Sequence, residues 1–331
     1  VGGILTFIPN IVILFLALAI LEDSGYMSRV AYVMDGIMGR AGLSGKAFLP
    51  MVLGFGCTVP AIMATRALET ERDRRKTMLI TPFMSCSARL PVYVLFSDLF
   101  FPGHPSAAAF SMYVIGMVVA LAAALVMHGI DRGEENASLL IELPEYKRPN
   151  GRTIGIYVWT KLKDYLEKAG TTIFIASILI WFVLNFGVSG MVENTGDSFG
   201  AMIGRGLVPV LAPAGLGMWQ IAVALISGIS AKEVVVSSFA VLFGVVNANS
   251  EAGMQAIVSG INAQYPGFGP VNAYALMVFC LLYVPCAATI ATVKKESGSW
   301  KFTLKMVLFQ LLLAWSAAVL VYQIGSRLPI V

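Results

Sequence analysis

The chain of 331 residues is 57% hydrophobic and only 13% charged, with a formal net charge of +4 and a mean hydropathy of +0.79. Soluble domains carry about a quarter charged residues, so this composition excludes a soluble globular protein. The apolar residues come in blocks of about 20, the length that crosses a hydrocarbon core. The sequence therefore predicts a helical membrane protein. No nucleic-acid-binding motif accompanies the basic residues, and the four cysteines lie in apolar segments, which argues against a nucleic-acid partner and an extracellular disulfide framework.

The first half of the chain combines two continuous apolar spans with irregular segments between them. The predicted order is a span at 3–21, an amphipathic segment at 26–40, a glycine- and proline-rich segment at 47–64, an interrupted span at 77–101 and a span at 107–130. Glycine and proline interrupt regular helices. Broken backbone at membrane depth is tolerated only where protein or a water-filled cavity covers it, so we expect both irregular segments to be covered in this way.

The second half repeats this order after a polar loop at 131–153. In chain order, its predicted elements are an amphipathic segment at 154–168, a span at 169–189, an amphipathic segment at 198–212, a segment at 217–246 that contains Gly228 and a charged pair, an interrupted span at 271–293 and a span at 303–324. The first of these amphipathic segments places Trp and Tyr beside lysines, a pattern typical of a helix in the membrane interface.

Positive charge is distributed unevenly among the segments between the spans, which predicts their sidedness. Those expected in the cytoplasm carry 19 of the 23 Lys and Arg residues, and they are 22–46, 66–76, 131–168 and 294–305. Those expected outside carry 2, and they are 102–106, 190–216, 247–270 and the C-terminal tail. With this assignment, 47–64 is a re-entrant hairpin from the cytoplasmic side and 217–246 is one from outside.

The two halves then share one plan in opposite orientations. The predicted fold class is an all-α membrane protein, a polytopic helical bundle with two inverted repeats that each contain a re-entrant or broken helix. The predicted divisions are a first repeat at 1–130, a cytoplasmic loop and interfacial helix at 131–168, and a second repeat at 169–331. Inverted repeats with discontinuous helices are typical of transporters, whose substrate site lies near the midplane.

Cysteines next to predicted helix breaks suggest a metal path. Cys57, Cys86 and Cys286 each adjoin such a break, where a thiol and freed backbone carbonyls could hold a cation together. These three are the candidate metal ligands. The candidate pore or gating residues are Gly54, Gly56, Thr58, Pro60, Glu69, Ser85, Arg89, Lys232 and Glu233.

Plainer interpretations exist for the same residues. A cysteine in a membrane helix is often a small packing residue, and Cys280, in an unbroken run, is assigned to packing. Charges at membrane depth are costly, so Arg89 and the Lys232–Glu233 pair suggest function, although the pair could be a structural ion pair. Glu69, in a basic loop, is either salt-bridged or a ligand at the entrance of the metal path.

Several runs of the sequence resemble the signature of the FeoB ferrous-iron transporters. They are Leu21–Val30 (LEDSGYMSRV), Gly54–Arg66, Glu69–Asp73 (ETERD), Pro82–Tyr93, Ala231–Val236 (AKEVVV) and Pro285-Cys286. The resemblance covers almost the whole chain and implies a gate-type membrane fold in a bacterial or archaeal cytoplasmic membrane. It also implies Fe²⁺ as the transported substrate, no cofactor in this chain, and a small FeoA-like cytosolic protein as a partner.

Members of this family also carry an N-terminal cytosolic GTPase domain that uses GTP and Mg²⁺. The present sequence has no phosphate-cradling GxxxxGK[ST] loop. Val1 is not an initiator residue, and no signal peptide is visible. We therefore expect a membrane domain taken from a longer protein, which is not itself an enzyme and which has that GTPase domain as a partner.

Two other functions compete with ferrous-iron transport. A gate-type transporter of another solute, such as a nucleoside or another divalent metal, would share the broken helices, and residue spacing alone does not select Fe²⁺ among divalent metals. An intramembrane enzyme is disfavoured because the sequence has no HExxH motif, no GxSxG motif and no paired aspartates within the spans.

Overall fold

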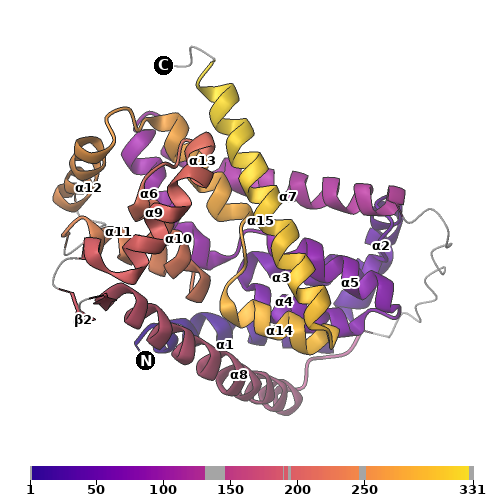
Figure 1. The fold of residues 1–331 in the computed structure, drawn as a ribbon. Helices are drawn as coiled ribbons and strands as arrows, with labels where there is room; N and C mark the ends of the chain where they lie inside the picture. The colour runs from indigo at the N-terminus through magenta and orange to yellow at the C-terminus, as the bar shows by residue number, and fades with distance from the viewer. Residues whose placement is uncertain (1, 131–145, 189, 193–194, 246–250, 328–331) are drawn as a thin grey trace. The chain divides into compact units, whose positions relative to one another are not determined.

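The computed structural model describes residues 2–130, 146–188, 190–192, 195–245 and 251–327 (Figure 1). It is 81% helical, and its only described strands are β1 (Phe186–Gly187) and β2 (Gly190–Met191), which pair antiparallel. The predicted class, a polytopic helical membrane protein, is therefore confirmed. The predicted inversion of two repeats is not tested by this structure and stays a prediction.

The described α-helices follow the predicted order along the chain. They are α1 (Gly2–Asp23), α2 (Tyr26–Arg40), α3 (Phe48–Gly56), α4 (Thr58–Ala64), α5 (Glu71–Ile80), α6 (Leu90–Phe100), α7 (Pro105–Ile130), α8 (Gly151–Asn185), α9 (Phe199–Leu211), α10 (Trp219–Ser230), α11 (Val234–Leu242), α12 (Glu251–Gln264), α13 (Pro270–Leu282), α14 (Ala287–Ser297) and α15 (Trp300–Gly325). Short 3₁₀ turns join several of them, among them η2 (Thr65–Ala67), η3 (Thr81–Phe83), η4 (Ser87–Arg89) and η6 (Ala212–Ala214).

Four described segments are long and apolar enough to cross a membrane. They are Glu71–Phe100, Pro105–Ile130, Pro270–Ser297 and Trp300–Gly325, and a fifth results if Phe199–Ala214 and Trp219–Ser230, bent by 102°, count as one. In α7 and α15 only 22% of the most apolar window is buried, which suits helices that face lipid, whereas the two interrupted segments are 61% and 72% buried. The broken spans are thus covered by protein, as broken backbone in a membrane requires.

Two predicted elements differ from the structure. The segment 154–168, expected as a separate interfacial helix before a span at 169–189, is the first part of the continuous helix α8. No proline separates the two parts, and a lone glycine inside a helix costs only about 1 kcal/mol, too little to end it. In the outer segment 247–270, α12 is a helix that the sequence analysis did not identify.

The chain packs as two compact units. The first unit contains 1–86, 117–174 and 288–300, and the second contains 87–116, 175–287 and 301–331. Each unit therefore draws on both predicted repeats. The predicted divisions at 1–130, 131–168 and 169–331 concern membrane topology, which packing does not test, and they stay a prediction.

Each unit has its own apolar core. In the first unit Phe15 and Leu18 of α1 pack with Leu53 of α3 and Ala61 of α4. In the second unit Phe96 of α6 meets Phe239 of α11 edge to face, with 5.3 Å between ring centroids. Such buried aromatic pairs contribute more than their buried area alone. These cores hold the helix breaks described next.

Candidate functional sites at the helix breaks

The first predicted hairpin consists of α3 and α4, which contact each other on either side of a one-residue break at Cys57. Cys57 has extended backbone (φ −149°, ψ 130°), and its amide still donates to the carbonyl of Leu53. We expected Pro60 to cause the interruption. Instead Pro60 lies in the first turn of α4, where a helix tolerates proline because the N–H groups there have no partner within the helix.

Close packing explains Gly54 in this hairpin. A Cβ on Gly54 would lie 2.8 Å from the Cβ of Met84 and 3.2 Å from the carbonyl oxygen of Thr81. Gly54 therefore allows α3 to approach the break in the span that α5 begins. A Cβ on Gly56 would likewise approach the side chain of Leu14, at 3.1 Å. Both glycines serve helix packing in the first unit.

The break after η3 contains Ser85 and Cys86, which are both buried. The side chain of Thr58, at the start of α4, is buried as well, and Cys57 is half-buried. The first unit thus contains two of the three predicted thiols, each at a break. Cys286, half-buried in the break between α13 and α14, belongs to the second unit.

The predicted three-thiol site stays a prediction, because its members are divided between the two units. In the described part of the chain, no three His, Cys, Asp or Glu side chains form a group that could hold a metal ion. A metal ion bound at the predicted thiols would need backbone carbonyls or hydroxyls as further ligands.

In the second unit, two helix breaks meet at a buried lysine. The first lies between α10 and α11, where Ala231 is extended (φ −153°, ψ 136°) and Lys232 follows with 3% of its surface exposed. The Lys232 Nζ donates to the carbonyl of Val284, 2.5 Å away, and lies 3.1 Å from the centroid of the Tyr283 ring. Both of these residues belong to the second break, between α13 and α14.

Glycine again permits the approach of the two breaks. A Cβ on Gly228 would lie 2.3 Å from the Tyr283 hydroxyl and 2.4 Å from Val235. Whether Lys232 and Glu233 act as a structural ion pair stays a prediction. Glu233 is only half-buried.

Another buried cation of the second unit is Arg89, at the end of η4, which is 2% exposed. Arg89 and Lys232 were both predicted to be functional from the cost of a charge at membrane depth. Tyr283 was not predicted, because aromatic residues are common in membrane helices and give no signal.

Glu69 lies in a charged region of the first unit. It pairs with Lys46 at 2.6 Å and is 61% exposed, so it forms a surface ion pair. A stronger interaction involves Glu296 of α14, a residue that the sequence analysis missed. Its carboxylate, 5% exposed, accepts from Arg66 Nε and Nη2 at 2.5 Å each, and its backbone carbonyl accepts from Arg74. The carboxylate joins η2 to α14, and the backbone carbonyl joins α5 to α14.

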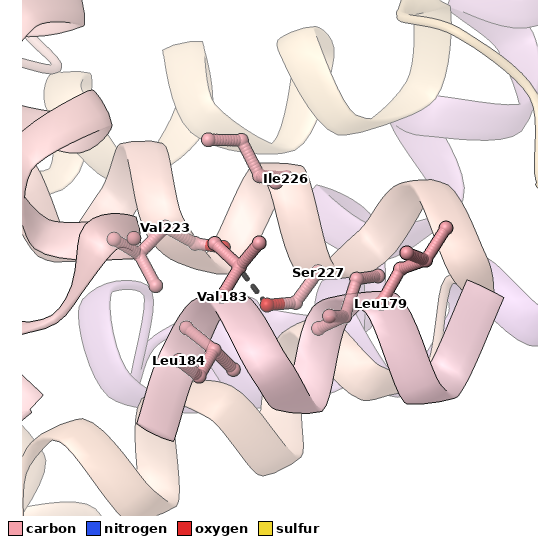
Figure 2. Close-up of a pocket in the computed structure, with 8 residues that line it drawn as sticks. Leu179, Val183, Leu184, Val223, Ile226 and Ser227 are labelled. Atoms are coloured by element: carbon pink, nitrogen blue, oxygen red, sulfur yellow. Dashed lines mark hydrogen bonds between the residues drawn. The ribbon is translucent and has the colours of Figure 1, made fainter. Parts of the chain in front are cut away.

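A small hollow in the second unit offers no polar site. Figure 2 shows it between α8 and α10, lined mainly by aliphatic side chains such as Val183 and Ile226. The hydroxyl of Ser227 points into this region but donates to the carbonyl of Val223 at 3.0 Å. Because its one polar side chain is already bonded, the hollow does not suit an ion.

Outside the spans, α1 and α8 contact each other in the first unit. Burial, with the carboxylate of Glu22 as a hydrogen-bond partner, raises the pKa of Tyr157 above its usual range. The backbone amide of Asn150 donates to Asp23 at 2.7 Å. These contacts fix the start of α8 against the end of α1.

Two family models match the chain. The Gate model, described as nucleoside recognition, matches residues 4–100 and 166–300, and a model of the C terminus of ferrous iron transport protein B matches 109–161. No solved structure matches the chain.

Curated relatives carry consistent names. The chain is 43% identical over 98% of its length to a protein named Fe(2+) transporter FeoB from Staphylococcus aureus, covering 47% of that protein. It is 41% identical over 99% of its length to one of the same name from Methanocaldococcus jannaschii, covering 48%. A Fe(2+) transport protein A/Fe(2+) transporter FeoB fusion protein from Porphyromonas gingivalis is 37% identical, with 98% of the chain and 43% of the relative covered. The chain thus spans about half the length of the curated relatives it matches.

Proposed function

Because this chain belongs to the FeoB family, we propose that it forms the membrane permease through which ferrous iron is taken up. The observation that carries the proposal is the match of nearly the whole chain to proteins named Fe(2+) transporters. Multiple membrane spans and buried helix breaks support it, since discontinuous helices are the usual place for ion sites in transporters. In this proposal the chain transports its substrate without changing it chemically.

The chemistry at the breaks suits an ion that must be released. Fe²⁺ accepts sulfur and oxygen ligands and binds weakly within the divalent series. We assign Cys57, Cys86 and Cys286 as ligands along its path, with Ser85, Thr58 and backbone carbonyls supplying oxygen. Such a mixed set holds an ion less firmly than four thiolates would.

The surroundings of the permease belong to the same proposal. We place the chain in the cytoplasmic membrane of a bacterium or archaeon, with its basic segments inside. A GTPase domain elsewhere in the whole protein and a FeoA-like protein are its proposed partners. The relative named as a fusion of transport protein A with FeoB supports the second of these.

Reconstitution tests the function directly. The purified chain and the whole protein are each placed in liposomes that contain a fluorescent Fe²⁺ chelator, under anaerobic conditions. We expect saturable Fe²⁺ entry above that of empty liposomes for the whole protein, and a dependence on GTP only when the GTPase domain is present. Absence of Fe²⁺ entry with both preparations would exclude the proposal.

The Gate model's description favours one alternative, transport of a nucleoside. The same liposomes measure it with a radiolabelled nucleoside outside. Nucleoside entry without Fe²⁺ entry would select this alternative, and Fe²⁺ entry without nucleoside entry would reject it. Replacing Fe²⁺ by Mn²⁺, Co²⁺ or Zn²⁺ tests the other alternative, another divalent metal.

A further inference from the structure

Lys232 has an unusual position for a residue of a cation transporter. Its ammonium is buried inside the second unit, at a point where two helix breaks meet. A charge removed from water costs several kcal/mol unless nearby groups compensate it. The compensating groups are therefore groups that favour a cation at this place.

Two such groups are the backbone and the ring of the α13–α14 break. Helix α13 ends at Leu282 and α14 begins at Ala287, so the carbonyl of Val284 lies between the two helices and accepts from the ammonium. The face of the Tyr283 ring, 3.1 Å from the Lys232 Nζ, adds the attraction of its quadrupole for a cation. Together they form a preformed cation site.

A side chain of the same break is of a kind that also binds transition metals. Cys286, which is half-buried, follows Val284 by two residues between α13 and α14. A carbonyl oxygen with a thiol beside it suits a divalent transition-metal ion better than it suits Na⁺ or Mg²⁺.

We propose that Lys232 is a tethered cation that occupies a divalent transition-metal site at the α13–α14 break, so that an incoming metal ion must displace its ammonium from the Val284 carbonyl. The role of Lys232 as a plug in the ion path rests on the proposed function, because a plug requires that the chain transports an ion. Like charges in a site of low dielectric repel strongly. The metal ion and the ammonium therefore exclude each other.

A purely structural role would predict a different response to substitution. If Lys232 only joins the two breaks, a neutral hydrogen-bond donor such as glutamine retains that role and creates no metal site. If Lys232 is a plug, glutamine removes the charge that excludes the metal ion. Lys232→Arg keeps the charge, and Lys232→Met removes both the charge and the hydrogen bond.

The experiment measures Co²⁺ binding to the purified chain and its variants in detergent, by equilibrium dialysis and by the absorbance of cobalt bound to sulfur. We expect Lys232→Gln to bind Co²⁺ about tenfold more tightly than the unsubstituted chain, because the repelling charge is gone. We expect Lys232→Arg to bind no more tightly. Thermal unfolding of each variant checks its fold, and Lys232→Met replaces Lys232→Gln if the latter does not fold.

A double variant tests whether the gained site is the one proposed. Lys232→Gln combined with Tyr283→Leu should lose much of the gained affinity, whereas Lys232→Gln combined with Ser111→Ala, at a hydroxyl on α7, should retain it. Equal Co²⁺ affinity for Lys232→Gln and the unsubstituted chain would overturn the inference, and so would an equal gain in Lys232→Arg.

The binding assay does not depend on transport. A gain in Co²⁺ binding without Fe²⁺ entry in the liposome assay would retain the cation site and reject the proposed function. Fe²⁺ entry with no gain in Lys232→Gln would retain the function and reject the plug.

Discussion

Gly54 shows how a single missing side chain determines the packing of a re-entrant hairpin. Because its Cβ would meet that of Met84 at 2.8 Å, Gly54→Ala should force the two segments apart and destabilise the fold by about 1–3 kcal/mol. Thermal unfolding of the purified chain in detergent measures this change. Gly36→Ala is the matched control, since nothing lies within 4 Å of its added Cβ and alanine favours an exposed helix interior. Equal melting temperatures for the two variants would contradict the packing role.

The three thiols make a second prediction at this scale. Cys57→Ser, Cys86→Ser and Cys286→Ser should each reduce Fe²⁺ uptake by roughly tenfold or more, since a hydroxyl is a much weaker ligand than a thiolate for a transition metal. Cys280→Ser is the matched comparison within an unbroken helix. Uptake is measured in liposomes and divided by the amount of inserted protein. Losses that follow protein amount alone would instead assign these cysteines to packing.

Lys232 illustrates what the sequence reveals about a residue and what it does not. A lysine within an apolar segment is costly, so the sequence alone was enough to single it out. Its acceptor, the carbonyl of Val284, is 52 residues away in the chain. No pattern of side chains indicates which backbone carbonyl a distant lysine will reach, and this part of the site required the structure.

At the scale of elements, Glu296 joins three of them, α14, α5 and the turn η2. Its buried carboxylate holds Arg66 with two hydrogen bonds, and such charge-assisted pairs are stronger than neutral ones. Glu296→Gln should therefore lower the free energy of unfolding by about 1.5–3 kcal/mol, because the charge-assisted hydrogen bonds of the buried carboxylate to Arg66 are replaced by weaker neutral ones.

A control in the same unit separates this effect from loss of surface charge. Glu69→Gln removes the exposed partner of Lys46, and surface ion pairs contribute only about 0–1 kcal/mol. Thermal unfolding at low and high salt compares the two variants. If Glu296→Gln proves no more destabilising than Glu69→Gln, the carboxylate of Glu296 does not hold η2 against α14.

Breaks and spans were predictable from sequence to different extents. The interruptions in 77–101 and 271–293 followed from proline and small polar residues, and both appear at the expected places. The predicted boundary between the interfacial helix and the next span is absent, since α8 runs through it without interruption. A proline in the sequence marks a helix break directly. A helix that continues is indicated only by the lack of a strong breaking residue, and this is a weaker signal.

At the scale of the whole molecule, helix content and spans were accessible to sequence analysis and the compact units were not. Hydropathy reports which segments avoid water. It does not report which buried segments pack together, and so gave no indication that 288–300 packs in one unit with the first 86 residues. That grouping depends on contacts distant in sequence, such as the one between Arg66 and Glu296.

Membrane sidedness remains the prediction on which the inverted-repeat model depends. The basic segments carry 19 of 23 Lys and Arg residues, and such segments stay in the cytoplasm. In a variant whose four native cysteines are replaced, Gln255→Cys on α12 should react with an impermeant thiol reagent added outside intact cells, and Asn150→Cys should not. Both positions are exposed, whereas position 250, in the same predicted outer segment, lies outside the described residues. Permeabilised cells provide the control, since both sites should then react. If only Asn150→Cys reacts in intact cells, the charge-based topology is reversed, and the two hairpins cannot enter from the sides assigned to them.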